Sequence, residues 1–153
     1  MQFPVSIPFV DHLGFELIRF DGGEAEIHVE LRPGLLNSFL VAHGGLSMTL
    51  LDVVMAHAAR SVQHESGAVT IEMKTSFFRP GEGRLRAVGK LLHRSATMAF
   101  TEGHVYGADG LLCAHATGTF KYVKRLPAAG REIKSLQRRE DRPHPPLQTD
   151  PPH

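Results

Sequence analysis

Apolar and polar residues alternate in several short stretches of the chain, while one longer stretch is apolar almost throughout. The clearest alternation covers residues 24–31, EAEIHVEL, in which every second side chain is apolar. Because successive side chains of a strand point to opposite faces, this stretch predicts a strand with one buried and one solvated face. Residues 14–20 precede it across an Asp-Gly-Gly turn at 21–23, so the two segments predict a β-hairpin.

A single long helix is predicted downstream, over residues 44–62. Its run LSMTLLDVVMAHAA has few polar residues anywhere on the helix circumference, so the helix must be buried. Four further strands are predicted after it, over residues 68–79, 83–94, 96–106 and 111–123. Two strands, one helix and four strands in this order predict an α+β fold with an antiparallel sheet.

The composition changes at Pro127. Residues 127–153 hold six of the ten prolines and only scattered apolar residues. Such a segment buries too little surface to offset its ordering entropy, so we expect a disordered tail. A short helix over residues 130–139 and a docking role for the tail remain open alternatives. The folded domain is therefore expected over residues 1–126.

Charge and cysteine content narrow the setting of the protein. A formal net charge of +1 gives no reason to expect nucleic-acid binding. The lone cysteine, Cys113, cannot form an intramolecular disulfide, which fits a reducing compartment. The N-terminus lacks the basic region of a signal peptide, and no apolar run approaches the roughly 20 residues of a membrane span. We therefore expect a soluble cytoplasmic protein without membrane or nucleic-acid partners.

The apolar helix carries one carboxylate, Asp52, and begins with two glycines behind His43. An ionised carboxylate in such a helix needs hydrogen-bond donors, a basic partner at the helix edge or a chemical role. Gly44 and Gly45 would leave backbone N–H groups open at the positive end of the helix dipole, a site suited to an oxyanion. A tight turn or close packing would explain the same two glycines.

The spacing of these features has a geometric consequence. Gly45 and Asp52 lie seven residues apart, on one helix face but separated by about 10.5 Å. One small acyl carbonyl cannot touch both. If both act on the same carbonyl, they must come from two chains related by a two-fold axis.

The spacing of Asn37, His43-Gly44-Gly45 and Asp52 resembles that of the hotdog-fold acyl-CoA thioesterases of the phenylacetate-degradation (PaaI-like) group. The resemblance runs over residues 10–124 and includes the stretch VTIEMKTSFFRPGEGRLRA. It implies a hotdog fold, in which a curved antiparallel sheet of five to six strands wraps a long central helix.

The resemblance also implies roles for individual residues. Gly44 would donate its backbone N–H to the thioester carbonyl, and Asn37 would position the substrate or the attacking water in the same half-site. Asp52 of the facing subunit would be nucleophile or general base, with Thr70 hydrogen-bonded near the water. His43 would hold the loop and orient the donor site.

Further residues are assigned to substrate binding. Gly45 is expected beside the thioester. Four residues at strand ends are candidates for the coenzyme A phosphates: Arg79, Arg84, Arg94 and Ser95. Arginine geometry suits phosphate, and the resemblance favours the Arg94–Ser95 turn, although these groups also fit ordinary solvated loop charge. Many members carry glycine where this chain has Leu40, so the loop shape is expected to differ.

No metal site is expected. His104 and His115 should face one another across a hairpin, but no carboxylate or cysteine stands at a recognised ligand spacing. No separate cofactor is expected either, since coenzyme A is part of the substrate.

The sequence thus predicts an acyl-CoA thioesterase that forms a homo-oligomer, a dimer of hotdog dimers, with sites at the dimer interface. Two alternatives remain open. One is an acyl-thioester dehydratase or hydratase, in which His43 and Asp52 would be the catalytic pair. The other is a non-catalytic acyl-CoA-binding module, which would have no reason to bury Asp52.

Overall fold

The computed structural model describes residues 1–127 and 133–139 of the chain. The helical elements are α1 (Pro8–Leu13), the 3-10 turn η1 (Pro33–Leu35) and α2 (Gly44–Arg60). The strands are β1 (Glu16–Asp21), β2 (Glu24–Glu30), β3 (Gly67–Phe77), β4 (Arg84–Arg94), β5 (Met98–Tyr106), β6 (Leu112–Val123), β7 (Arg125–Pro127) and β8 (Ile133–Ser135).

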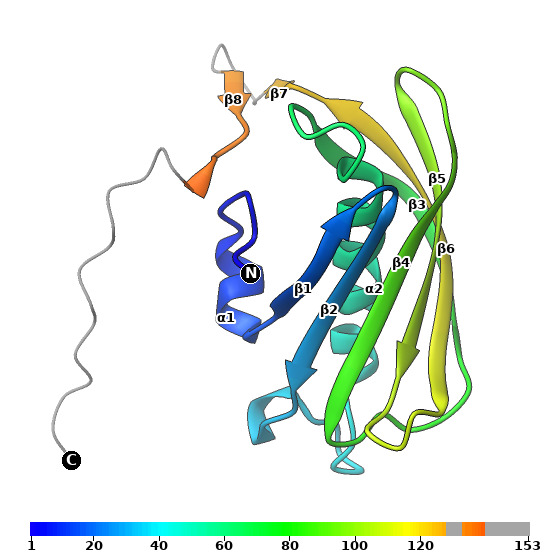
Figure 1. Cartoon of the computed structure of the whole chain (residues 1–153). Coiled ribbons are helices and arrows are strands. Elements are labelled where there is room, and N and C mark those ends of the chain that lie inside the picture. The colour runs from blue at the N-terminus through cyan, green and yellow to red at the C-terminus, as the bar shows by residue number, and fades with distance from the viewer. Residues whose placement is uncertain (128–132, 140–153) are drawn as a thin grey trace, which may run out of the picture.

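One six-stranded antiparallel sheet dominates the molecule, in the order β1-β2-β4-β5-β6-β3. The strand that follows α2 in the chain, β3, therefore lies at one edge of the sheet, and β1 lies at the other. The sheet curves around α2, which lies along its concave face (Figure 1). This is the hotdog arrangement, and the predicted fold is confirmed.

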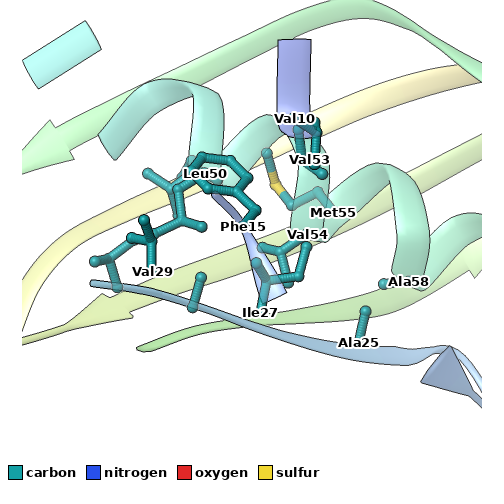
Figure 2. Close-up of a cluster of buried hydrophobic side chains, with 14 of the residues drawn as sticks. Val10, Phe15, Ala25, Ile27, Val29, Leu50, Val53, Val54, Met55 and Ala58 are labelled. Carbon is teal, nitrogen blue, oxygen red and sulfur yellow. The ribbon is translucent and has the colours of Figure 1, made fainter. Parts of the chain in front are cut away.

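The helix lies against the sheet because glycines let it approach. A Cβ at Gly89 of β4 would collide with the Val54 carbonyl oxygen, and one at Gly118 of β6 would stand 2.9 Å from the Met55 side chain. Apolar side chains of α2, β2 and the N-terminal segment fill the remaining space, as Figure 2 shows around Ile27 and Val54. The core thereby fixes both the depth of α2 and the direction in which its polar residues point.

The predicted helix and all six main strands are present, with ends shifted by up to two residues. The pattern did not predict α1, because its six residues are too few to establish helical periodicity. Its first turn holds Pro8 and its C-cap is Gly14 at φ 75°, both common helix-end signals.

Part of the expected tail contacts the domain. β7 pairs with β8, and the Ser6 N–H donates to the Gln137 carbonyl at 2.9 Å. Arg139 also forms an ion pair with Asp11 at 3.1 Å. A strand thus stands within the stretch considered for a short helix. The expectation of disorder also covers residues 128–132 and 140–153, which lie outside the described residues. Within the described ranges no helix is long and apolar enough to cross a membrane.

Candidate active site

The start of α2 separates the roles of its two glycines. His43 is the N-cap, and its Nδ1 accepts the Gly45 N–H at 2.8 Å. The Gly44 N–H has no hydrogen-bond acceptor among the described residues. Because the Gly45 N–H already donates to His43, the Gly44 N–H is the amide left open to a substrate oxygen.

Asn37 holds the loop that precedes the helix. Its Oδ1 accepts the N–H groups of Phe39 at 2.9 Å and Val41 at 3.3 Å, and its own N–H donates to the Val41 carbonyl. Leu40 within this loop has φ 60°, in the left-handed region. The loop therefore keeps a backbone conformation that favours glycine, although the side chain there is leucine.

Asn37 and Gly44 meet in a groove of about 510 Å³, here called the glycine groove. Its lining also includes Phe77, Phe78, Arg79 and Cys113. His43 and Gly45 instead line a separate hollow on the other side of the helix start, with Phe9 and Thr49. The structure therefore brings Asn37 together with Gly44, and places Gly45 away from them.

Asp52 and Thr70 form a second pair. The Thr70 hydroxyl, on β3, donates to Asp52 Oδ1 at 2.6 Å. Asp52 is partly buried and Thr70 is exposed. Burial raises the pKa of the Asp52 carboxyl above its ordinary value, and the Thr70 hydrogen bond opposes that rise. Thr70 therefore orients the Asp52 carboxylate, whose charged form is less favoured than that of an aspartate in water.

The two pairs do not meet within one chain. Asp52 does not line the glycine groove, and it stands eight residues along α2 from Gly44, about 12 Å of helix. The chain therefore carries an open amide at one place and an oriented carboxylate at another.

A second cavity, here called the distal pocket, begins one helix turn beyond Asp52. It has a volume of about 290 Å³, and Ala56 of α2 and Val69 of β3 lie in its wall. The N-terminal segment, residues 123–125 and residues 135–137 also line it. His57 and Arg60 also line this pocket. Both side chains are buried, and each has one nitrogen without a hydrogen-bond partner among the described residues. No sequence pattern predicts this pocket, because its walls come from segments far apart in the chain.

The phosphate-binding candidates are distributed over both ends of the helix. Arg94 donates to Gln63 just beyond the C-terminal end of α2, and the Ser95 hydroxyl accepts the Thr97 and Met98 N–H groups within the turn. Arg79 lines the glycine groove instead. Arg84 forms an ion pair with Glu16 at 2.7 Å, which gives it a structural partner.

The paired histidines have a carboxylate neighbour that sequence reasoning overlooked. His104 and His115 face one another in the β5–β6 register, as expected. Glu102 Oε1 lies 2.8 Å from His115 Nε2 and 3.7 Å from His104 Nε2, so the three side chains could hold a metal ion. The expectation that no carboxylate stands at a suitable spacing is therefore wrong, because Glu102 lies diagonally across from His115 on the same sheet face.

Large apolar side chains are exposed near both pairs. On β3 and just after it these are Ile71, Phe77 and Phe78, and on the loop and first turns of α2 they are Phe39, Leu40 and Met48. The outer edge of β3 has no partner strand within the described part of the chain. An unpaired strand edge beside exposed apolar residues indicates a surface made for association.

Comparison with known proteins identifies the family to which this chain belongs. The thioesterase superfamily matches residues 39–114. A protein of Saccharolobus solfataricus named as a candidate esterase is 30% identical over 74% of this chain and 81% of its own length. A variant of the phenylacetic acid degradation protein PaaI from Thermus thermophilus is 30% identical, with a TM-score of 0.69 over 76% of this chain and all of that one. A conserved protein of Pseudomonas aeruginosa is 28% identical, with a TM-score of 0.74 over 78% of this chain and 97% of that one. The chain therefore belongs to the thioesterase superfamily, and its relatives include PaaI-like hotdog proteins.

Proposed function

We propose that this protein hydrolyses acyl-CoA thioesters at sites formed between two protomers. The observation that carries the proposal is the division of the machinery along α2. Gly44, whose N–H has no acceptor among the described residues, lines the glycine groove, and a carboxylate oriented by Thr70 lies about two turns further along the helix. Neither half completes a hydrolytic site alone.

A two-fold dimer unites the halves. Pairing the free edge of β3 with the same edge of a second copy would cover the exposed apolar residues there, and an isologous contact of this kind generates two identical sites. Each site would then take Gly44 and Asn37 from one protomer and Asp52 with Thr70 from the other. We extend this to a dimer of such dimers as the assembled state.

The chemistry needs few groups because a thioester is already an activated acyl donor. The thioester carbonyl oxygen accepts the Gly44 N–H, which stabilises the oxyanion as it forms. Asp52 removes a proton from a water molecule, whose oxygen bonds to the carbonyl carbon while the carbon–sulfur bond breaks. The proton then passes to the departing thiolate, giving a carboxylic acid and coenzyme A.

Direct attack by Asp52 gives the same products through a transient anhydride, which water then hydrolyses. A single turnover in ¹⁸O-labelled water detects the anhydride route in which water attacks the Asp52 carbon. General-base catalysis places the label only in the product acid, whereas the anhydride route puts label into the Asp52 carboxyl group when water attacks its carbon.

The surroundings of Asp52 suit the two ends of the substrate. The distal pocket, one turn beyond Asp52, would accept the acyl group. Arg94 and Ser95 would bind the coenzyme A phosphates, since guanidinium groups bind phosphate bidentately. Replacing Arg94 by Glu should then raise KM for acyl-CoA more than it lowers kcat, and an unchanged KM would remove Arg94 from this role.

Release of free thiol from a panel of acyl-CoA substrates tests the proposal. The wild-type protein should release coenzyme A with at least one acyl group, and Asp52→Asn should lower kcat by roughly 100-fold or more. Absence of thiol release across aromatic and aliphatic acyl groups would contradict it. Hydration of an enoyl thioester without thiol release would instead identify the dehydratase or hydratase reaction.

A further inference from the structure

The cluster of Glu102, His104 and His115 combines the ligand types of a transition-metal site. One carboxylate oxygen of Glu102 faces the Nε2 atoms of both histidines, at 2.8 Å and 3.7 Å. The ligand atoms of all three residues lie within 4.8 Å of one another. Two imidazoles and one carboxylate are a common three-ligand set for zinc and related dications, with one position left open.

The sheet holds these side chains together. His104 of β5 and His115 of β6 are directly opposite, and Glu102 precedes His104 by two residues on the same strand face. The opposite face of these strands packs on α2, where a Cβ added at Gly103 or Gly118 would stand 3.0 Å or 2.9 Å from the Met55 side chain. The cluster is therefore fixed on the outer face of a rigid sheet, on the side away from the helix, and it takes no part in the proposed hydrolysis.

The cluster is open to solvent. The side chains of all three residues are about 30% exposed, which leaves a dication a route to them.

We propose that Glu102, His104 and His115 bind a divalent transition-metal ion of the zinc class and thereby cross-link β5 to β6. The distances need only small side-chain adjustments, because ligand oxygen and nitrogen atoms around zinc stand about 2.0–2.2 Å from the ion. Because the ion binds the folded state and not the unfolded state, it should raise the unfolding temperature of the protein by mass action.

Titration of the full-length, tag-free and chelator-treated protein with Zn²⁺ and Co²⁺ tests this site. We expect wild type to bind one ion per chain, and His115→Ala and His104→Gln to lose this binding. Bound Co²⁺ should show the visible absorption of an ion with nitrogen and oxygen ligands. At a hundredfold excess of Zn²⁺ over its Kd, the unfolding midpoint should rise by roughly 5 °C or more. Mg²⁺ should have no such effect, because it prefers octahedral oxygen ligands.

His28→Ala is the matched control. His28 forms a similar pair with Glu26 at 2.7 Å on β2, outside the three-ligand cluster, so its loss should leave Zn²⁺ binding unchanged. Unfolding of each metal-free variant shows whether the fold persists. The proposal is overturned if wild type binds no Zn²⁺, or if folded His104→Gln and His115→Ala bind it as wild type does. Loss of binding in His28→Ala alone would also overturn it.

Discussion

At the scale of single residues, Asp52 is held in a state that stability alone would not select. Burial disfavours its charged form, and the Thr70 hydroxyl is its one hydrogen-bond donor among the described residues. A raised pKa in the folded state means that ionised Asp52 reduces stability at neutral pH. This cost suits a group retained for chemistry rather than for the fold.

The pH dependence of wild-type hydrolysis follows from this shift. As the pH falls through the raised pKa of Asp52, the carboxylate gains a proton and loses the lone pair that the proposed base or nucleophile needs. The acid limb of the kcat profile should therefore lie above the ordinary aspartate value of 3.8. The weak residual activity of Asp52→Asn should lack this limb. The free energy of unfolding of the Asp52→Asn protein at pH 7 should not fall below that of wild type. An acid limb that persists in Asp52→Asn would assign it to another group.

Leu40 provides a test of loop strain. Its left-handed backbone costs a non-glycine residue about 1–2 kcal/mol, and its side chain is 76% exposed, so little packing is lost on removal. Leu40→Gly should raise the free energy of unfolding by roughly 0.5 kcal/mol, after the entropy cost of glycine is subtracted. Urea unfolding measures this. The neighbouring Phe39, exposed and outside the left-handed region, is the control, because Phe39→Gly should only destabilise.

At the scale of elements, the distance between α2 and the sheet depends on glycine positions. Gly89→Ala would drive a Cβ into the Val54 carbonyl, and helix backbone cannot rotate away as a side chain can. We expect a loss of about 1–3 kcal/mol or more in urea unfolding. Gly34→Ala, with no atom within 4 Å of the added carbon, should change stability little. Equal effects of the two changes would contradict this close approach.

Elements with a long pattern were predictable, and contacts between distant segments were not. The apolar run of α2 and the alternation in β2 establish their structure locally, because burial repeats at every turn or every second residue. The family resemblance placed Thr70 near the attacking water, and the structure adds that its hydroxyl donates to Asp52. The occupation of the Gly45 amide by His43 depends on a side-chain rotamer, and the distal pocket depends on several separate segments, so neither leaves a sequence pattern.

At the scale of the whole molecule, His57 links acidity to stability. It is buried under Phe3 and Phe20, and burial lowers its pKa to about 4 from 6.5. Between pH 6.5 and 4, His57 therefore binds a proton in the unfolded chain but not in the folded chain. Stability should fall as the pH drops from 6.5 towards 4, by about 1.4 kcal/mol per pH unit.

Urea unfolding at pH 7, 6 and 5 and fixed protein concentration measures this contribution as a difference between wild type and His57→Met. The two should differ in slope below pH 6.5, with the variant less sensitive to acid. Parallel profiles would show that His57 does not resist protonation in the folded state.

Division of each active site between two protomers is the central claim, and heterodimers of two inactive variants test it most directly. Gly44→Pro removes the donor N–H at the first helical position, where proline is well tolerated, while Gly44→Ala keeps the N–H and should remain active. Heterodimers of Gly44→Pro and Asp52→Asn chains, isolated with two affinity tags, carry one intact site of the two. They should show about half the thiol-release rate of the wild-type dimer, whereas each parent homodimer shows almost none. Heterodimers as inactive as both parents would contradict a site shared between protomers.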